Sequence, residues 1–496
     1  MSSTTSAANP SAQVTVQVEG KSVTFPTQLY INGEWVNGHG TPLKSFNPAT
    51  EELITAVHTA DENDIELAVQ AAREAFETTW SLNVAGAERG RLLYKFADII
   101  EANLDTVVAL EAADGGKPLQ WARGDLMASL AAIRYYAGMA DKIQGFTCEV
   151  GDPSKSVTVR KEPIGVVAQI VPWNFPVMMW AWKIAPALAA GCSIIFKPAE
   201  NTPLAALYLT KLMEQVGWPK GAFNLLNGTG KVVGEPLALH MDIDKIAFTG
   251  STAVGRHISA CAAKSNLKRV TLELGGKSPN IVFPSANLQE AAKWAAFGLF
   301  ETSGQSCIVG SRILVHEDIY ENFVSDFVKV VEKIRVGKDP KAFYGSLISK
   351  VQFDKVLNYI EIGKKESKLE TGGARHGDKG YFVQPTVFSN VNMTHQIARE
   401  EIFGPVASII KFKDEKEAIS IANDTTYGLA AAVHTLDASQ MARVTRRLRA
   451  GTVWVNQYSV LHPNVPFGGV RQSGVGRELG PNGIENYLET KVKADD

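Results

Sequence analysis

The sequence of 496 residues has only four cysteines and no CxxC pair, and its charges nearly cancel. The spacing is too wide for a disulfide framework or a zinc site among Cys148, Cys192, Cys261 and Cys307. We therefore expect no metal site and a reducing, cytoplasmic location. Fifty basic against 52 acidic residues give a formal net charge of −2, which argues against binding nucleic acid through a large positive field.

The sequence also lacks an uninterrupted run of about 18 apolar residues, so we expect no membrane span. Its longest apolar stretch, residues 166–196, contains prolines, Asn174 and Lys183. The N-terminus has neither the basic start and apolar segment of a secretory signal nor the Arg content of a mitochondrial presequence. We expect residues 1–26 to form a short disordered lead.

Short apolar strands alternate with helices through the rest of the chain, which favours parallel, doubly wound sheets. Helices are expected at 61–76, 87–112, 122–141, 176–190, 203–216, 231–240 and 253–265, and strands at 29–36 (a hairpin), 157–171, 194–196, 223–226, 245–248 and 270–274. A second set has strands at 280–283, 312–315, 406–411 and 451–455, helices at 288–299 and 317–335, and a final strand at 484–492. The prediction is an α/β fold with two doubly wound lobes.

Two motifs follow strands of the first set. In PWNFP (172–176) the prolines restrict the backbone and present Asn174 rigidly. Such a carboxamide suits an oxyanion, although a structural turn is the alternative. FKPAEN (196–201) puts Lys197 and Glu200 at the end of a strand, where open α/β sheets bind ligands. Here the acid can accept ribose hydroxyls, and a solvated ion pair is the alternative.

Three further motifs have both a chemical and a structural interpretation. In FTGSTAVG (248–255) Ser251 lies at a helix start that suits a phosphate, but the GxGxxG pattern is absent, so a structural junction is the alternative. Glu273, in LELGGKSPNIV (272–282), is a buried general base or a turn cap. Cys307, in SGQSCIVGSR (303–312), is a nucleophile or a small buried side chain.

Together, the order and spacing of these motifs resemble the NAD(P)-dependent aldehyde dehydrogenase superfamily, in particular its tetrameric, non-acylating branch. The resemblance extends over nearly the whole chain through EEIFGPV (400–406), YGLAAAV (427–433), GTVWVN (451–456), PFGGV (466–470) and SGVGRELG (473–480). It implies an NAD-binding domain of residues 27–146 and 162–275 and a catalytic domain of residues 276–472. Residues 147–161 and 473–496 would form an oligomerisation arm and C-terminal strand.

The resemblance also implies a catalytic mechanism. Cys307 would attack the aldehyde to give a thiohemiacetal and then a thioester, with the oxyanion held by Asn174 and the Cys307 backbone amide. Glu273 would activate the water that releases the acid. Lys183 and Glu478 match a proton path behind Glu273.

The implied cofactor is NAD. Its implied contacts are Val171, Pro172, Trp173, Asn174, Lys197, Glu200, Gly230, Gly234, Phe248, Thr249, Gly250, Ser251, Leu274, Glu401 and Phe403. Lys197 and Glu200 match contacts to the adenosine ribose, Ser251 a pyrophosphate contact, and Glu401 the acid on the nicotinamide ribose. Because the Glu200 carboxylate would repel a 2′-phosphate, NADP is disfavoured.

The implied substrate tunnel is mostly apolar and suits medium-chain aliphatic or aromatic aldehydes. It consists of Phe175, Met178, Met179, Trp182, Glu301, Ser306, Ile308, Leu461 and Phe467. Glu301 and Val309 depart from the family's usual pattern. An aminoaldehyde or betaine-aldehyde oxidiser, with Glu301 and tryptophans as a cation site, is the first alternative.

A catalytically idle structural relative is the second alternative. It is disfavoured because Asn174, Glu273 and Cys307 are all retained. The expected partners are a small aldehyde and further copies of the chain, in a homotetramer or, alternatively, a dimer.

Overall fold

The computed structural model describes residues 10–152 and 154–495. The first lobe is built on a sheet with the spatial order β21 (Gly474–Val475), β13 (Arg269–Glu273), β12 (Lys245–Thr249), β9 (Val166–Ile170), β10 (Ser193–Lys197), β11 (Phe223–Leu225), β3 (Leu29–Ile31) and β4 (Glu34–Val36). Its central strands, from β13 to β11, are parallel, and the others pair antiparallel at the edges.

Helices cover both faces of this sheet because its buried strands are apolar on both sides. Val167 and Ile194 pack with α2 (Gly86–Ala102), α3 (Leu104–Gly115), α4 (Leu119–Met139), α5 (Pro176–Ala190) and α6 (Leu204–Met213). Val166 and Ile195, the neighbouring residues, pack with α1 (Glu62–Thr78), α7 (Glu235–Leu239) and α8 (Thr252–Lys264) on the other face.

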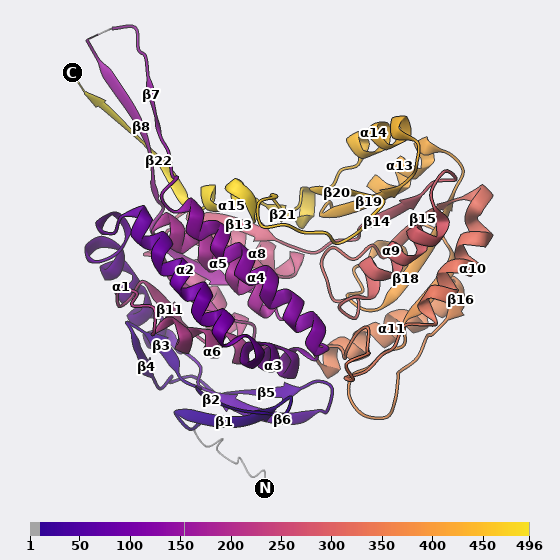
Figure 1. The fold of residues 1–496 in the computed structure, drawn as a ribbon, viewed down its shortest axis with the longest axis horizontal. Coiled ribbons are helices and arrows are strands. Elements are labelled where there is room, and N and C mark those ends of the chain that lie inside the picture. The colour runs from indigo at the N-terminus through magenta and orange to yellow at the C-terminus, as the bar shows by residue number, and fades with distance from the viewer. Residues whose placement is uncertain (1–9, 153, 496) are drawn as a thin grey trace.

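The second lobe repeats this arrangement. Its sheet has the order β16 (Lys368–Thr371), β17 (Thr386–Val391), β18 (Val406–Phe412), β15 (Arg312–His316), β14 (Pro279–Val282), β19 (Ala430–His434) and β20 (Thr452–Val455). One face packs on α9 (Leu288–Phe300) and α10 (Tyr320–Val331), and the other on α11 (Lys350–Glu366), α12 (Gln396–Arg399), α13 (Glu415–Asn423) and α14 (Ala438–Arg447). The predicted α/β class with two doubly wound lobes is confirmed (Figure 1).

An antiparallel arm projects from the first lobe (Figure 1). It consists of β22 (Leu488–Asp495), β8 (Ser156–Pro163) and β7 (Phe146–Cys148), with β8 in the middle. Within the described chain, the outer edges of β22 and β7 have no strand beside them. Phe146 and Val492 are 60% and 61% exposed. Exposed strand edges with apolar side chains are surfaces on which another chain can pair.

The expectation of a disordered lead over 1–26 is wrong from Gln13 onward. Residues 13–26 form a hairpin of β1 (Gln13–Val18) and β2 (Lys21–Pro26). Val16, Val23 and Phe25 are buried in the first lobe's core, so this hairpin belongs to the packed structure. A second hairpin, β5 (Leu43–Asn47) and β6 (Glu52–Val57), was not predicted. The first nine residues of the predicted lead lie outside the described residues.

Several predicted boundaries are also wrong. The helix expected at 87–112 is two helices, α2 and α3, separated at Asn103. The strand expected at 157–171 is divided between the arm and the first lobe, because Gly165 turns the chain at φ +134° between β8 and β9. The helix expected at 231–240 consists of a π turn, Gly230–Gly234, and α7.

The C-terminal boundary differs for a tertiary reason. The arm was expected from residue 473, but β21 pairs with β13 and therefore belongs to the first lobe's sheet. The final strand, expected at 484–492, begins at Leu488 because α15 (Gly480–Glu485) precedes it.

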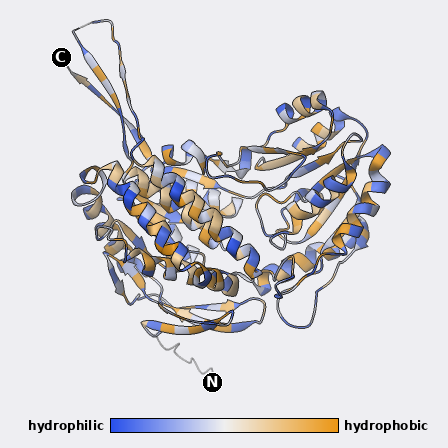
Figure 2. Ribbon diagram, viewed as in Figure 1, coloured by the Kyte–Doolittle hydropathy of each residue, from blue (hydrophilic) through white to orange (hydrophobic). Residues whose placement is uncertain are grey.

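The exposed helices alternate in polarity along their length. Figure 2 shows hydrophilic and hydrophobic residues interleaved on α2 and α4, as is typical of helices with one face toward water. Among the described residues, no helix is both long and apolar enough to cross a bilayer.

Candidate active site

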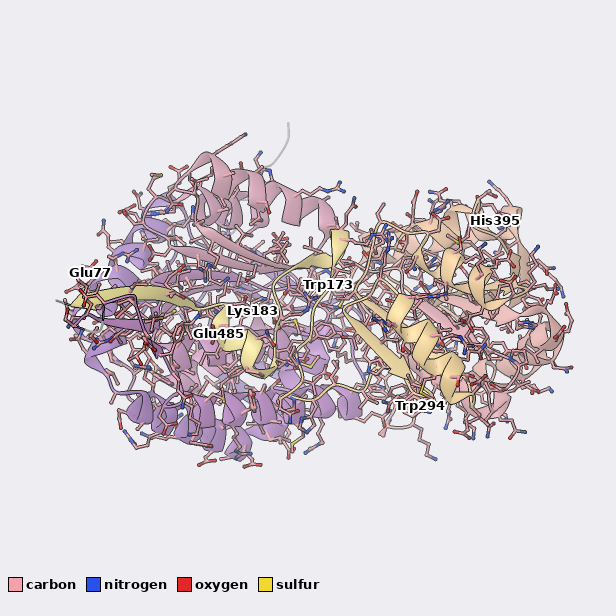
Figure 3. All side chains as sticks on the ribbon, turned by 90° about the horizontal axis from the view of Figure 1, so that it is seen from above. Glu77, Trp173, Lys183, Trp294, His395 and Glu485 are labelled. Carbon is pink, nitrogen blue, oxygen red and sulfur yellow. The ribbon has the colours of Figure 1, made fainter. Side chains whose placement is uncertain are left out.

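A cavity of about 470 Å³ lies where the two lobes meet. The first lobe contributes the segments that follow β9, β12 and β13, and the second contributes residues 301–308, 352–355 and 401–403. Figure 3 places Trp173, which lines this cavity, between the lobes. The carboxyl ends of parallel strands are the usual binding edge of open α/β sheets. The cavity brings together three predicted catalytic residues, Asn174, Glu273 and Cys307.

A hydrogen bond from its side-chain amide holds Asn174 in place. The residue follows β9 and is buried, and Pro176 starts α5 two residues later. Its Nδ2 donates a hydrogen bond to the carbonyl of Gln305 at 2.8 Å. The carboxamide is therefore tied to the loop that carries Cys307.

The Cys307 loop leaves α9 through a tight turn. Ser303 and Gly304 have φ of +56° and +68°. A Cβ at Gly304 would lie 2.1 Å from the Gly404 carbonyl oxygen, so only glycine fits there. The Ser303 hydroxyl donates to the Gly345 carbonyl at 3.0 Å, and Gln305 Oε1 accepts the Ile348 amide at 3.0 Å. These bonds hold a half-buried cysteine in one position.

Two glycines bring this loop close to Glu273. A Cβ at Gly276 would lie 2.3 Å from the Cys307 carbonyl oxygen, and one at Gly275 would lie 2.4 Å from the Glu401 carboxylate. The Gly276 amide donates to Glu401 Oε1 at 2.9 Å. The Gly-Gly pair thus allows Cys307 and Glu401 to pack against the end of β13.

Glu273 ends β13 and is 3% exposed. Within the described chain, its Oε1 is buried without a hydrogen-bond partner. Burial, reinforced by the nearby Glu478 carboxylate, raises the pKa of Glu273 well above its usual value. This agrees with the buried general base that was one interpretation of the sequence, and it is typical of a carboxyl that exchanges protons near neutral pH.

The Cys307 thiol has a similar environment. Burial and the Glu273 and Glu401 carboxylates raise its pKa well above the ordinary value. Reaction as a thiolate therefore requires a base or a positive charge nearby.

Lys183 and Glu478 do not line the cavity but lie behind Glu273. Their side chains form an ion pair, with Lys183 almost fully buried and Glu478 Oε2 lacking a partner in the described chain. Figure 3 places Lys183 within the first lobe. The backbones of Phe467 and Glu478 exchange hydrogen bonds of 2.6 Å, which link the ion pair to the cavity wall.

The predicted cofactor residues fall into two groups. One group lines the cavity: Pro172, Trp173, Asn174, Thr249, Gly250, Ser251, Leu274, Glu401 and Phe403. The other lies outside the cavity lining: Val171, Lys197, Glu200, Gly230, Gly234 and Phe248. Within this second group, Glu200 Oε1 accepts the Gly230 amide, and a Cβ at Gly234 would lie 3.9 Å from Lys197 Cδ.

The chemistry of these groups suits a dinucleotide. Ser251 caps α8 by accepting the Val254 amide at 3.3 Å, so this helix's N-terminus faces the cavity. Buried Thr249 Oγ1 has no partner in the described residues. Hydroxyls and helix amides suit phosphate, and carboxylates such as Glu200 and Glu401 suit ribose hydroxyls. Phe403 holds Trp173 edge-on at 5.3 Å between ring centroids.

All nine predicted tunnel residues line the cavity. Trp182 and Phe467 form an edge-to-face pair with centroids 5.4 Å apart. The cavity is also lined by residues that were not predicted from the sequence: Trp121, Gly124, Asp125, Ala128, Gly275, Thr302, Gln352, Lys355 and Ser459. Trp121 and Asp125, four residues apart on α4, share a face, but nothing in the sequence shows that this face meets the tunnel.

Glu301 is the one acid among the predicted tunnel residues. Ser459 Oγ donates to its Oε1 at 2.6 Å. Burial raises the Glu301 pKa to about 7, so the carboxyl is partly neutral at neutral pH. Nearby, the Lys117 ammonium pairs with Asp125 and lies 4.3 Å from the centroid of the Phe175 ring.

Two lobes of this kind, meeting at a cavity with a cysteine and groups that suit a dinucleotide, define a two-lobed α/β protein with a nucleotide-type site. The chain belongs to the aldehyde dehydrogenase family, whose sequence model matches residues 35–493. It is 52% identical over 471 residues to an aldehyde dehydrogenase of Emericella nidulans, with 94% of each chain covered. Aldehyde dehydrogenase 1A1 of Gallus gallus is 51% identical over 473 residues, covering 94% of this chain and 92% of the relative.

Solved structures agree with this membership. Betaine aldehyde dehydrogenase of Staphylococcus aureus, in complex with NAD+, superimposes with a TM-score of 0.93 at 39% identity, covering 95% of this chain and 94% of the other. An NAD+ complex of an aldehyde dehydrogenase from Bacillus cereus superimposes with a TM-score of 0.92 at 45% identity, covering 95% and 96%.

Proposed function

We propose that the protein oxidises medium-chain aliphatic or aromatic aldehydes to carboxylic acids with NAD. The observation that carries this proposal is the convergence of Asn174, Glu273 and Cys307 on one cavity between the lobes. A structural relative without activity would have no reason to keep a buried carboxyl oxygen unpartnered beside a cysteine, because that arrangement costs stability.

The chain's own groups account for each step. The Cys307 thiolate adds to the aldehyde carbon, and Asn174 Nδ2 and the Cys307 amide hold the oxygen of the thiohemiacetal. NAD, held by residues such as Ser251 and Glu401, would supply the hydride acceptor, and Cys307 would keep the oxidised carbon as a thioester. Glu273 then takes a proton from water as the water adds to the thioester carbonyl. Breakage of the C–S bond releases the acid and restores the thiolate.

Lys183 and Glu478 complete this scheme as positioning and proton-path residues. Their ion pair places a carboxylate close enough to raise the Glu273 pKa. The proton that Glu273 accepts can pass toward this pair.

NAD rather than NADP is proposed as the cofactor. The NAD+ complexes among the similar structures support NAD itself. Glu200 supports the selectivity, because its carboxylate would repel a 2′-phosphate. In Glu200→Gln we expect the ratio of kcat/KM for NAD over NADP to fall. A wild-type protein that prefers NADP would contradict the argument.

A second candidate is the oxidation of a cationic aldehyde. It is supported by the similarity to the S. aureus betaine aldehyde dehydrogenase and by Glu301 in the tunnel wall. Two observations make it second: the Glu301 pKa is about 7, and the Lys117 cation already occupies the face of Phe175. A second cation would be repelled there.

One substrate panel separates the two candidates. We expect higher kcat/KM, measured by NADH formation, for hexanal, phenylacetaldehyde and indole-3-acetaldehyde than for betaine aldehyde. A preference for betaine aldehyde would reverse the order of the candidates, and no activity with any of the four would contradict the apolar-aldehyde assignment.

The domain division, assembly and location remain proposals. Residues 27–146 and 162–275, with the hairpin of residues 13–26 packed on them, form the cofactor-binding domain, and 276–472 form the catalytic domain. The exposed edges of β22 and β7 support a homotetramer with the dimer as the alternative. Light scattering after size exclusion decides between the tetramer and the dimer.

The free cysteines are compatible with the proposed cytoplasmic location.

A further inference from the structure

Away from the cavity, three side chains of unlike chemistry converge where α7 meets α8. Glu235 begins α7, and His257 and Cys261 lie one turn apart on α8. Residues four apart share one face of a helix, and both side chains face Glu235. The oxygen, nitrogen and sulfur atoms of the three all lie within 4.8 Å of one another.

Two distances in this cluster match edges of a tetrahedral metal site. His257 Nε2 lies 3.4 Å from Glu235 Oε2 and 3.6 Å from Cys261 Sγ. Zinc bonds of about 2.0–2.3 Å at tetrahedral angles place nitrogen and oxygen about 3.4 Å apart, and nitrogen and sulfur about 3.6 Å apart. Two of the three edges thus have the lengths that an ion requires, and the third, between the Glu235 carboxylate and Cys261 Sγ, is at most 4.8 Å.

A second cluster shows what a purely hydrogen-bonded arrangement looks like. His39, Asp61 and Asp64 also lie within reach of a common ion. There, however, His39 Nδ1 lies 2.9 Å from Asp64 Oδ1, and Asp64 Oδ2 accepts two backbone amides. Asp61 Oδ1 in turn accepts the Asp64 amide, so His39 Nδ1, both Asp64 oxygens and Asp61 Oδ1 are already used in hydrogen bonds. In contrast, Nε2 of His257 carries at most one proton and cannot satisfy both Glu235 and Cys261.

The surroundings allow an ion to enter. The side chains of His257 and Glu235 are 52% and 39% exposed, whereas Cys261 is buried beneath them. Two ligands thus lie at the surface and one below it, which leaves the fourth position of a tetrahedron to water. Three protein ligands and an open position form a common zinc arrangement.

We propose that Glu235, His257 and Cys261 bind a zinc-class divalent cation, with water as the fourth ligand. Binding displaces the thiol proton of Cys261 to solvent. The ion joins α7, which follows Gly234, to α8, which Ser251 caps. On the proposed function, both positions contact the cofactor, so the ion would stiffen this part of the cofactor site.

Cobalt(II) provides a spectroscopic test that needs neither substrate nor cofactor. The titration uses metal-free Cys307→Ala protein, so that the cavity thiol does not bind cobalt. We expect one cobalt per chain and a thiolate-to-cobalt charge-transfer band. Adding Cys261→Ala should abolish the band. Adding His257→Gln should weaken binding by more than about 100-fold, because loss of an outer-sphere partner alone costs 10–100-fold.

Cys148→Ala in the same background is the matched control and should leave the band unchanged. Circular dichroism verifies that each variant is folded. A zinc-induced rise in melting temperature should occur in Cys307→Ala protein and disappear with Glu235→Gln. The proposal is overturned if no band forms, if the band survives Cys261→Ala, or if Cys148→Ala removes it. If the wild-type protein does not oxidise aldehydes but the cobalt site forms as expected, only the proposed function is contradicted.

Discussion

The inner and outer parts of the cavity are held by different kinds of structure. At the inner part, Glu273 ends a central strand, Asn174 follows another, and the Cys307 loop is tied to Asn174 through Gln305. At the outer part, Trp121 comes from α4, and Glu301 lies at the C-terminus of α9. Backbone pairing thus fixes the proposed chemistry, whereas side-chain packing shapes the region that meets the rest of the substrate.

The two carboxyl groups, Glu273 and Glu301, show what this difference means energetically. Both are buried and both have raised pKa values. Glu301 receives a hydrogen bond from Ser459, but Glu273 Oε1 has no partner in the described chain. An uncompensated buried carboxyl costs stability and is typical of a reacting group, while a compensated one suits recognition.

The largest expected effect is at the nucleophile. Cys307→Ala should lower aldehyde turnover by about 10⁴-fold or more, as loss of a covalent nucleophile does elsewhere. NADH formation measures the loss, and calorimetric NAD titration verifies that the site is intact. Cys192→Ala is the control and should remain active, because Cys192 does not line the cavity. Substantial turnover in Cys307→Ala would show that the inner part does not work as proposed.

The next largest effect separates the two half-reactions. Glu273→Gln should slow thioester hydrolysis by about 10²–10⁴-fold, because a carboxamide cannot take a proton from water. Rapid-quench analysis should show a burst of NADH followed by slow turnover. Unchanged steady-state turnover would remove Glu273 from the proposed mechanism.

The pH profile tests the cause of the raised pKa values. Because the Cys307 thiol must ionise before it adds to the aldehyde and its pKa is raised, kcat/KM should increase toward alkaline pH. Because Glu273 must be ionised to take a proton from water and its pKa is raised, kcat should increase toward alkaline pH as well. Glu478 is one of the charges that raise the Glu273 pKa, so Glu478→Gln should move the kcat profile to lower pH. A profile that moves to higher pH would show that the carboxylate of Glu478 does not raise the Glu273 pKa.

The smallest expected effect is at the outer carboxyl. Glu301→Gln should change the relative kcat/KM of aldehydes only several-fold and leave the burst of NADH intact. The effect is small because the hydrogen bond from Ser459, worth about 1 kcal/mol, can still form with the carboxamide. The same substrate panel measures it, and Ser459→Ala should change the ranking in the same direction. A loss of the NADH burst in Glu301→Gln would show that the outer part of the cavity, like the inner part, takes part in the chemical steps.

The sequence by itself predicted the inner part well, for a physical reason. Strand ends, prolines and glycines can be recognised from the few residues around them. The side chains that they position keep the same separation along the sequence in proteins of this fold. The α/β class follows from the alternation of apolar strands with helices and is confirmed. Hence PWNFP, LELGG and the cysteine loop were found as candidates, and the family resemblance favoured their chemical over their structural interpretation. The structure brings Asn174, Glu273 and Cys307 to one cavity.

Tertiary structure alone decided the rest, because those features depend on contacts between distant segments. The hairpin at residues 13–26 packs on the first lobe's core, and β21 joins a sheet whose other strands lie more than two hundred residues earlier. Trp121 and Ser459 reach the tunnel only through the packing of α4 and a late loop. The cluster of Glu235, His257 and Cys261 could not be predicted from the sequence, because only the contact of α7 with α8 brings the three side chains together.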